Sequence, residues 1–265
     1  MCTILAWCGE HPSWPLVIAA SRDEYEGRAA SAPQALHLDP LVIGGRDDVA
    51  GGTWLAISER GFVVALANRK GAGAHDSSKR SRGELTLEAG RADDVAAARR
   101  TVEAEDPRAY NPFILIAADA DGGFVAHGGE RGLEIVELAR GAHAITNWDL
   151  DSRAQPKAAR ALAAANAASI ARVPGPDALA RDLQTLLADH AEGAHGLDGG
   201  LCAHRPAQAY GTRSSWIVML GTALVEGELA RPLLRAYYIE GHPCEGELCD
   251  VSHLLRGESQ QRVKA

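Results

Sequence analysis

The chain has 265 residues, of which 46% are hydrophobic and 23% are charged, a composition typical of a folded protein of one or two domains. Acidic residues outnumber basic residues by 35 to 27, and the net charge of −8 disfavours binding to nucleic acid or to anionic lipid. No apolar run approaches the roughly 18 residues that a membrane-spanning helix requires. These features exclude disordered and fibrous proteins and predict a soluble protein with no nucleic-acid partner and no membrane span.

The N-terminus and the cysteines favour a cytoplasmic location. Residues 1–7 are apolar, but they include no basic segment and are too short for a signal peptide. The five cysteines, at positions 2, 8, 202, 244 and 249, show no dense spacing, which is typical of free thiols rather than of a disulfide framework. No repeat or linker divides the chain, so we expect a single domain over residues 1–255 and a polar tail over residues 256–265.

Hydrophobic patterning predicts a first block of short strands followed by two helices. The expected strands cover residues 2–7, 16–21, 41–44, 53–58 and 62–68. The expected helices cover residues 82–90 and 94–104, and Ser81 and Glu84 before the first of them have capping-box spacing.

A second block of strands and helices completes the chain. The expected strands cover residues 113–119, 124–127, 133–138, 143–147, 215–220, 223–229 and 233–239, with helices over 152–168 and 177–190 set between them. Two blocks of strands separated by helices predict packed antiparallel sheets flanked by helices, because each sheet must bury one face.

Cys2 directly follows the initiator methionine, and its small side chain favours removal of Met1. The freed α-amine, with a pKa of about 7.7–8.0, would lie a few bonds from the thiol, so one residue would supply a nucleophile and a general base. From position alone, a small apolar residue beginning a buried strand is the more common role for such a cysteine.

A charged cluster follows the predicted strand over residues 16–21. The strand ends in Ser21, Arg22, Asp23 and Glu24. Arg22 would stabilise a nearby thiolate, and a carboxylate would orient the amine of Cys2. A continued strand would place Asp23 on the opposite face from Arg22, whereas a turn would bring the two together. A solvated ion pair at a strand end is an equally good interpretation.

Several short sequence blocks together resemble a known family. They are Met1-Cys2-Thr3, Ala20-Ser21-Arg22-Asp23-Glu24, Gly44-Gly45-Arg46-Asp47, Gly51-Gly52-Thr53-Trp54-Leu55, Leu66-Ala67-Asn68-Arg69 and Tyr210-Gly211-Thr212-Arg213-Ser214-Ser215. Over roughly residues 1–240 the chain is similar to the transport and Golgi organisation protein 2 family, also called the NRDE family. The motif that names the family begins with Asn, where this chain has Ser21.

The resemblance implies an α+β fold of the N-terminal nucleophile hydrolase type, a four-layer αββα sandwich of antiparallel sheets. More distantly, the layout is similar to the cholylglycine hydrolase and penicillin V acylase group, whose N-terminal cysteine cleaves non-peptide amides. On that analogy Cys2 attacks a carbonyl, its α-amine takes and returns the proton, and Arg22 and Asp23 position both. Asn147 would donate its amide to the developing oxyanion, with Asn68 as the second candidate; turn formation is the alternative role of both.

Arg213 and a glycine-rich loop are further candidates for the site. Arg213 precedes an apolar strand, and a buried arginine needs an anionic or hydrogen-bonding partner, so we favour a site role over a structural clamp. The loop over residues 44–54 lacks both a Walker A lysine and the dinucleotide fingerprint. It therefore predicts a loop near the substrate rather than a phosphate cradle, with Trp54 as a pocket wall or a core residue.

Two weaker groupings favour no site. His242, Cys244, Cys249 and His253 fall within twelve residues, but their spacing is not that of a standard zinc finger, so we expect no metal site. A basic segment is expected to be a solvated loop, with attraction of an anionic ligand tail as the alternative; it contains Arg69, Lys70, Lys79, Arg80 and Arg82.

We therefore predict an N-terminal cysteine amidohydrolase that acts on a small acyl amide or a related acyl substrate without a cofactor. The competing prediction is a carrier, because the family is associated with intracellular haem trafficking and with lipid or acyl-coenzyme A metabolism. The same cleft would then bind haem or an acyl lipid without catalysis, with His11, His127, His143 and His204 among the possible axial ligands. A structural interaction protein ranks last, because it needs no charged cluster behind Cys2. The sequence specifies neither the substrate nor the oligomeric state.

Overall fold

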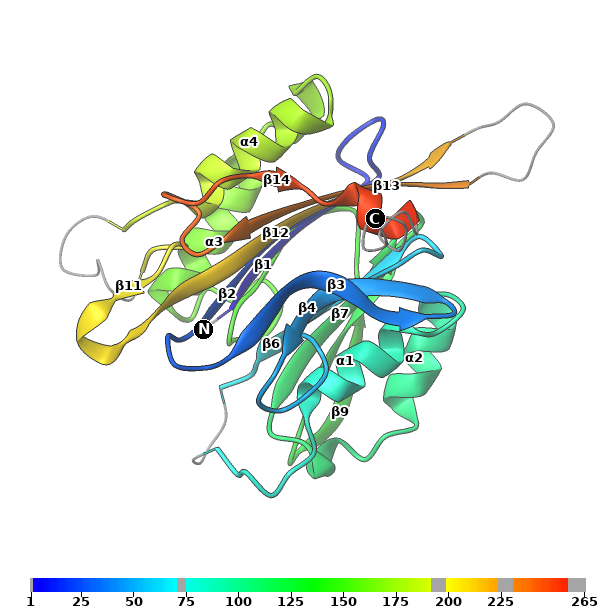
Figure 1. Cartoon of the computed structure of the whole chain (residues 1–265), viewed down its shortest axis with the longest axis vertical. Helices are drawn as coiled ribbons and strands as arrows, with labels where there is room; N and C mark the ends of the chain where they lie inside the picture. The colour runs from blue at the N-terminus through cyan, green and yellow to red at the C-terminus, as the bar shows by residue number, and fades with distance from the viewer. Residues whose placement is uncertain (1, 71–74, 192–198, 224–230, 257–265) are drawn as a thin grey trace, which may run out of the picture.

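The computed structural model describes residues 2–70, 75–191, 199–223 and 231–256, which form a four-layer αββα sandwich (Figure 1). Two antiparallel sheets pack face to face, and a pair of helices covers the outer face of each. The α+β sandwich predicted from the sequence is confirmed.

The first sheet contains both the N-terminal strand and the strands at the end of the chain. Its order is β10 (Gly141–Ile145), β1 (Thr3–Cys8), β2 (Leu16–Tyr25), β12 (Tyr210–Ala223), β13 (Arg231–Glu240) and β14 (Cys249–Asp250), with β11 (His204–Arg205) paired to β12. The N-terminal strand therefore lies inside the sheet, between β10 and β2.

The second sheet is a meander in sequence order. It contains β3 (Ala30–Leu38), β4 (Leu41–Asp47), β5 (Leu55–Ser58), β6 (Phe62–Asn68), β7 (Phe113–Asp119), β8 (Gly123–Gly129) and β9 (Gly132–Glu137). Each strand pairs with its neighbour in the sequence, so short turns connect most of the sheet.

The outer layers are α1 (Arg82–Gly90) and α2 (Val95–Glu103) on the second sheet, and α3 (Pro156–Ala167) and α4 (Pro176–Leu187) on the first. The Ser81 side chain caps α1 by accepting from the Glu84 amide, as the capping-box spacing predicts. Short 3₁₀ turns cover Pro107–Ala109, Ile170–Arg172, Pro206–Gln208 and Ser252–Arg256.

Strand β1 shows why the sequences of the central strands are continuous apolar runs. Ile4 and Ala6 belong to the core between the sheets, whereas Leu5 and Trp7 pack against the helices α3 and α4. Because helices cover the outer face, side chains on both faces of the strand are buried and both must be apolar. Burial of each large aliphatic side chain contributes about 1.5–3 kcal/mol.

The predicted elements agree with the structure except at edges. Strand β3 was not predicted, because it is an exposed edge strand that contains Pro33 and has no clear apolar alternation. Strand β12 begins at Tyr210, five residues before the predicted strand. Residues 224–229 of the strand predicted at 223–229, and residues 257–265 of the predicted tail, lie outside the described residues.

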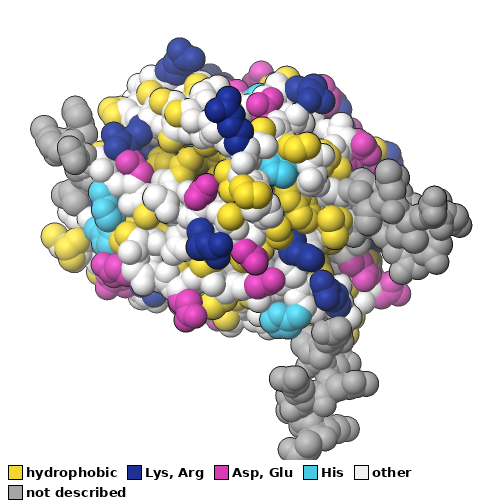
Figure 2. All heavy atoms as spheres, turned by 90° about the horizontal axis from the view of Figure 1, so that it is seen from above, with side chains coloured by type: hydrophobic (Ala, Val, Ile, Leu, Met, Phe, Trp, Pro, Cys, Tyr) yellow, Lys and Arg dark blue, Asp and Glu magenta, His cyan; other side chains and the backbone are white. Residues whose placement is uncertain are grey.

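None of the described helices is long and apolar enough to cross a membrane. On the face seen in Figure 2, basic and acidic side chains are interspersed rather than gathered into a patch of one sign. That face therefore offers no concentrated charge to a polyanionic partner.

Candidate active site

The registers of three strands align Cys2 with Arg22 at one end of the first sheet. Strands β1 and β2 pair Thr3 with Ser21, so the next position along each strand aligns Cys2 with Arg22. Strands β2 and β12 pair Arg22 with Ser214. Residues directly opposite one another in an antiparallel sheet share a face, and Cys2 packs in the core between the sheets. The three side chains therefore point toward the second sheet.

Asn147 lies at the same end of the sheet. Strand β10 pairs Ile145 with Ile4 of β1, and the same register continued for two residues aligns Asn147 with Cys2. The Asn147 side-chain amide donates to the backbone oxygen of Asn68, at the end of β6 in the second sheet. Asn147 Oδ1 is buried without a hydrogen-bond partner among the described residues. The predicted pair of asparagines therefore meets, although Asn68 contributes its backbone rather than its amide.

The Cys2 thiol is buried among charged groups. Burial raises its pKa above the ordinary value, and the Asp23 carboxylate raises it further. The Arg22 guanidinium and a hydrogen bond to the backbone of Asp23 act in the opposite direction. Arg82, at the start of α1, also interacts electrostatically with Cys2. Burial thus outweighs the nearby positive charges and raises the pKa of the thiol, although two arginines beside it favour a thiolate.

The Asp23 side chain points to the opposite face of the sheet, toward α3. Its carboxylate accepts from the Lys157 ammonium at 2.7 Å and from the Thr212 hydroxyl at 2.7 Å. The exposed fraction is 0% for the Asp23 side chain and 7% for that of Lys157. Tyr210 donates its hydroxyl to the Asp23 backbone oxygen at 3.0 Å. Strand β2 continues through Tyr25, so the turn that would have placed the Asp23 side chain beside Arg22 does not form.

A small cavity lined by four arginines lies beside the aligned side chains of Cys2, Arg22 and Ser214. Its volume is about 50 Å³, which suits a carboxylate or a few waters rather than a whole organic ligand. Its lining includes Arg22, Arg28, Arg46, Asp47, Trp54, Arg213, Tyr238 and Glu240. Arg28 pairs with Asp47 at 2.7 Å, and Glu240 accepts from the Tyr238 hydroxyl. The remaining arginines leave the cavity positively charged.

One of these arginines has a buried donor without a partner among the described residues, and another lies at an irregularity of the sheet. Nη2 of Arg22 is buried and has no hydrogen-bond partner in the described part of the chain. Arg213 is the extra residue of a β-bulge, since the β2–β12 register shifts between Thr212 and Ser214. A buried donor with no partner is costly, and a bound anion would satisfy it.

The end of β4 and the glycine-rich loop that follows it form part of the cavity wall. Gly45 and Trp54 line it, and the Thr53 hydroxyl donates to the Gly45 backbone oxygen at 2.6 Å. Gly52 has a φ of +71°, and a Cβ there would lie 2.1 Å from the backbone of Gly83 in α1. The loop can therefore pack against α1 only with glycine at this position.

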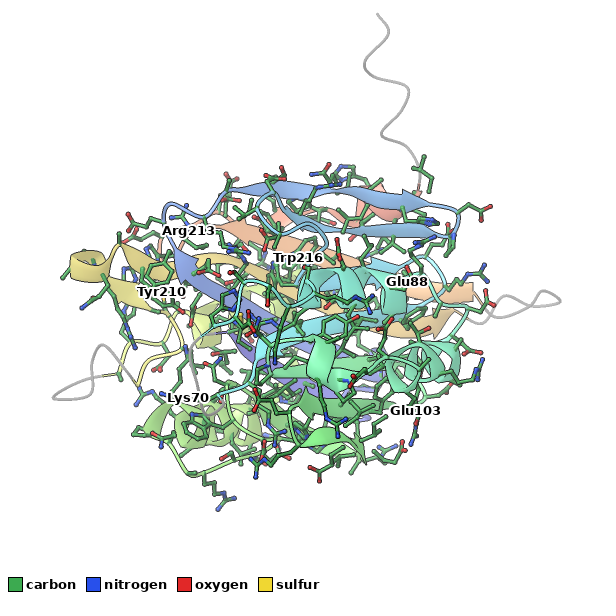
Figure 3. All side chains as sticks on the ribbon, turned by 90° about the horizontal axis from the view of Figure 1, so that it is seen from below. Lys70, Glu88, Glu103, Tyr210, Arg213 and Trp216 are labelled. Carbon is green, nitrogen blue, oxygen red and sulfur yellow. The ribbon has the colours of Figure 1, made fainter. Side chains whose placement is uncertain are left out.

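The labelled side chains of Figure 3 show which end of the molecule carries the site. Lys70, Tyr210 and Arg213 lie at one end, and Glu88 and Glu103 lie at the other. The Lys70 backbone amide donates to the Asn147 backbone oxygen at 2.8 Å, which attaches the loop after β6 to the loop after β10. Loops from both sheets thus meet around Cys2.

Sequence reasoning missed Lys157 and underestimated Arg82. Lys157 precedes Ala161 and Ala165 at intervals of four, and both alanines are buried. A lysine on the apolar stripe of a helix is the signal that would have found it, because a buried ammonium requires an anionic partner. Arg82 appeared only as one member of the basic segment.

That basic segment does not form a cationic patch. Arg69 pairs with Asp149 at 2.6 Å, Lys79 pairs with Glu130 at 3.7 Å, and Arg80 pairs with Glu105. Arg82 donates to the backbone oxygen of Pro112 at 2.9 Å. The acidic partners neutralise most of these charges, but Arg69 and Lys79 are only 18% exposed, so they are less solvated than predicted. Residues 71–74 of the predicted loop lie outside the described residues.

The histidines considered as haem ligands have partners within the protein. Nδ1 of His11 accepts from two backbone amides, and Nε2 of His127 accepts from the Leu150 amide at 3.3 Å. His143 pairs with Asp151 at 2.7 Å, and this contact raises the pKa of His143. His204 contacts Cys202 and Cys244. Each of these four histidines therefore has at least one ring nitrogen engaged within the protein, whereas Nδ1 of His127 is buried without a hydrogen-bond partner among the described residues.

Comparison with known proteins identifies the family and the fold. Residues 1–224 match the family model described as Transport and Golgi organisation 2. The chain is 36% identical over 148 residues to the Transport and Golgi organization protein 2 homolog of Bos taurus, and 31% identical over 147 residues to the human homolog. Each match covers 53% of this chain and 53% of the relative, so the chain spans about half the length of the curated relatives it matches.

Solved structures with the same fold are far more distant in sequence. A mutant of the conjugated bile acid hydrolase from Clostridium perfringens has 12% identity and a TM-score of 0.56, covering 96% of this chain and 93% of its own. A second variant of that hydrolase has 11% identity and a TM-score of 0.54, covering 95% and 93%. The chain therefore has the same overall fold as this hydrolase.

The Asp23–Lys157 pair generates a stability prediction. Lys157→Met should lower the free energy of unfolding by about 3–5 kcal/mol, because it removes the ammonium partner of a buried carboxylate. Arg160→Met is the matched control, since Arg160 lies on the same helix and pairs with Asp189 at the surface. That change should cost about 0–1 kcal/mol. Denaturant unfolding measures both, and equal losses in the two variants would contradict a structural role for the buried pair.

Proposed function

Because this chain belongs to the Transport and Golgi organisation 2 family and has an N-terminal nucleophile hydrolase-like fold, we propose that it is a cysteine hydrolase of small acyl amides. The observation that carries the proposal is the register of β1 with its two neighbours. Extended one residue past the Thr3–Ser21 pair and two past the Ile4–Ile145 pair, it would bring Arg22 and Asn147 to either side of Cys2. Each neighbour has a buried polar atom without a partner among the described residues. Such atoms at one end of a sheet support a binding site for a polar reacting group.

In the proposed reaction, removal of Met1 makes the α-amine of Cys2 the general base. The amine accepts the thiol proton, and the sulfur forms a bond to the carbonyl carbon of the substrate. Collapse of the tetrahedral intermediate breaks the C–N bond, and the ammonium returns the proton to the departing amine. Water then cleaves the thioester, releasing the acid and the free thiol.

The residues around Cys2 would each have a definite part. Arg22 and Arg82 would stabilise the thiolate, offsetting the burial that raises the thiol pKa. Asp23, held by Lys157 and Thr212, would keep its backbone hydrogen bond to the thiol in place. Asn147 would use its second amide hydrogen for the oxyanion, and removal of one such donor from a serine protease costs about 2.7–4 kcal/mol.

The arginine cavity supports a substrate with an anionic group close to the scissile bond. Two residues aligned with Cys2, Arg22 and Ser214, also line the cavity. Arg213 and Arg46 supply further positive charge. Guanidinium groups bind carboxylates and phosphates through paired hydrogen bonds. Both solved neighbours carry the name of a hydrolase of conjugated bile acids, which supports a hydrolytic reaction.

A haem carrier remains the alternative from family association, but no observation on the described residues favours it.

The first prediction concerns processing. Met1 should be absent from the mature active protein, because an N-terminal methionine would block the amine that acts as base. Intact mass measurement of the protein from its native host decides this. Met1 retained on fully active protein would contradict the mechanism and leave the fold unaffected.

A second prediction concerns the nucleophile. Cys2→Ala should reduce the turnover of acyl amides by about 10⁴-fold or more, and Cys2→Ser should retain little activity, because the thiolate is the far better nucleophile near neutral pH. An acyl-amide panel and covalent labelling by a β-lactam probe measure the effect.

Cys8→Ala is the matched control for this experiment. It also removes a thiol, but at the opposite end of β1 and on the same face of the sheet as Cys2. Its activity should be close to that of the unmodified protein, with thermal melting as the check on folding. Undiminished turnover in Cys2→Ala would rule out nucleophilic catalysis by this residue.

A third prediction tests the charge of the substrate. Arg213→Gln should lower kcat/KM for acyl amides that carry a carboxylate by about 10–100-fold, the loss of one charge-assisted hydrogen bond. Neutral analogues of the same shape should change little. Arg181→Gln, an exposed position on α4, makes the same charge change away from the cavity and should affect neither. Equal losses on charged and neutral substrates would contradict the anion-binding role.

A further inference from the structure

A cluster of two cysteines and two histidines lies outside the candidate active site. Its members are His190, Cys202, His204 and Cys244, and one ligand atom from each lies within 4.8 Å of those of all the others. We propose that these four side chains bind a single zinc ion. Two thiolates and two imidazoles form one of the common tetrahedral zinc sites of proteins.

Three separate segments contribute the ligands. His190 follows α4, Cys202 and His204 lead into and begin β11, and Cys244 lies in the loop between β13 and β14. The four residues are spread over more than fifty positions of sequence, so no short motif marks them. The sequence grouping around His242 contributes only Cys244.

The separations between three of the four ligand atoms are close to those of a tetrahedral site, and the His190 nitrogen lies within 4.8 Å of the other three. Zinc bonds of about 2.3 Å to sulfur and about 2.0–2.1 Å to nitrogen imply edges of about 3.8 Å between two sulfurs and about 3.6 Å between sulfur and nitrogen. The Cys202 and Cys244 sulfurs are 3.7 Å apart. Nε2 of His204 lies 3.3 Å from each sulfur. This nitrogen is therefore equally distant from the two sulfurs, as expected for three ligands of one ion.

A disulfide explains the cluster less well. The sulfur separation of 3.7 Å far exceeds the roughly 2.05 Å of a disulfide bond, and a disulfide has no use for the two histidines. The His242 ring stacks on the His204 ring with centroids 3.7 Å apart, and this stacking fixes the ring plane of His204. Four protein ligands leave no open position, so the ion would be structural rather than catalytic.

Such an ion would support the active site through Ala203, which lies between two of the ligands. The Ala203 amide donates to the Thr212 hydroxyl at 2.9 Å, and the Thr212 amide donates to the Ala203 oxygen at 2.9 Å. The same Thr212 hydroxyl donates to the Asp23 carboxylate at 2.7 Å. Zinc would therefore hold the segment that positions Thr212 and, through it, Asp23 beside Cys2.

The test is metal analysis of the full chain, purified with reductant and without a metal-affinity step. Elemental analysis should find about one zinc per chain. Cys244→Ser should lose nearly all of it, and so should His204→Ala. Cys249→Ser is the matched control, because Cys249 is exposed, lies five positions from Cys244 and is outside the cluster; it should keep its zinc.

Cobalt substitution provides a second, independent measurement. Apo-protein loaded with Co²⁺ should show the visible absorption of tetrahedral cobalt with thiolate ligands, and Cys244→Ser and Cys202→Ser should lose it. Since Cys202 is buried and its variant can fail to fold, the exposed Cys244 carries the test, with thermal melting as the check. Removal of zinc by a chelator should lower the melting temperature of the unmodified protein and leave that of Cys244→Ser unchanged.

Three results would overturn the proposal. The first is unmodified protein that contains no zinc and binds cobalt without thiolate absorption. The second is a Cys202–Cys244 disulfide in protein that also holds metal. The third is equal zinc content in Cys244→Ser and Cys249→Ser. None of these measurements depends on hydrolysis, so the zinc site and the proposed reaction stand or fall separately.

Discussion

The interaction on which the site depends is the burial of the Asp23 carboxylate between the first sheet and α3. An isolated carboxylate in that environment would be strongly unfavourable, so Lys157 and the Thr212 hydroxyl must accompany it. These partners come from a helix and from a strand that are each more than a hundred residues away in sequence. One buried charge thus fixes the relative positions of β2, β12 and α3, and it keeps the end of β2 straight beside Cys2.

Because β2 continues as a regular strand, Asp23 and Arg22 point to opposite faces of the sheet and have different roles. Asp23 faces α3 and is fully engaged, whereas Arg22 faces the second sheet and retains a donor without a partner in the described part of the chain. The β-bulge at Arg213 adds another cation at the same place. The protein therefore uses its hydrogen-bonding capacity on the structural face and leaves it available on the face that opens to the arginine cavity.

The family and the fold carry different information about function. The chain has the same fold as a hydrolase of only 12% identity, because two sheets that are covered on both faces tolerate many apolar sequences. The chemistry depends on single residues at the ends of strands. For that reason Cys2, Arg22, Asp23 and Asn147, rather than the sandwich itself, carry the proposed reaction.

By itself the sequence determined the sandwich of sheets and helices, because periodicity and apolar runs report burial locally, and the motifs at Cys2, Arg22 and Asp23 indicated which strand ends matter. Only the tertiary structure decided what joins them. The register of β1 between β2 and β10 aligns Arg22 and Asn147 with Cys2, and α3 brings Lys157 to Asp23. The tertiary structure also brings four residues that are far apart in the sequence into one cluster: His190, Cys202, His204 and Cys244. Such contacts between distant segments depend on strand order and helix packing, which the pattern of neighbouring residues does not encode.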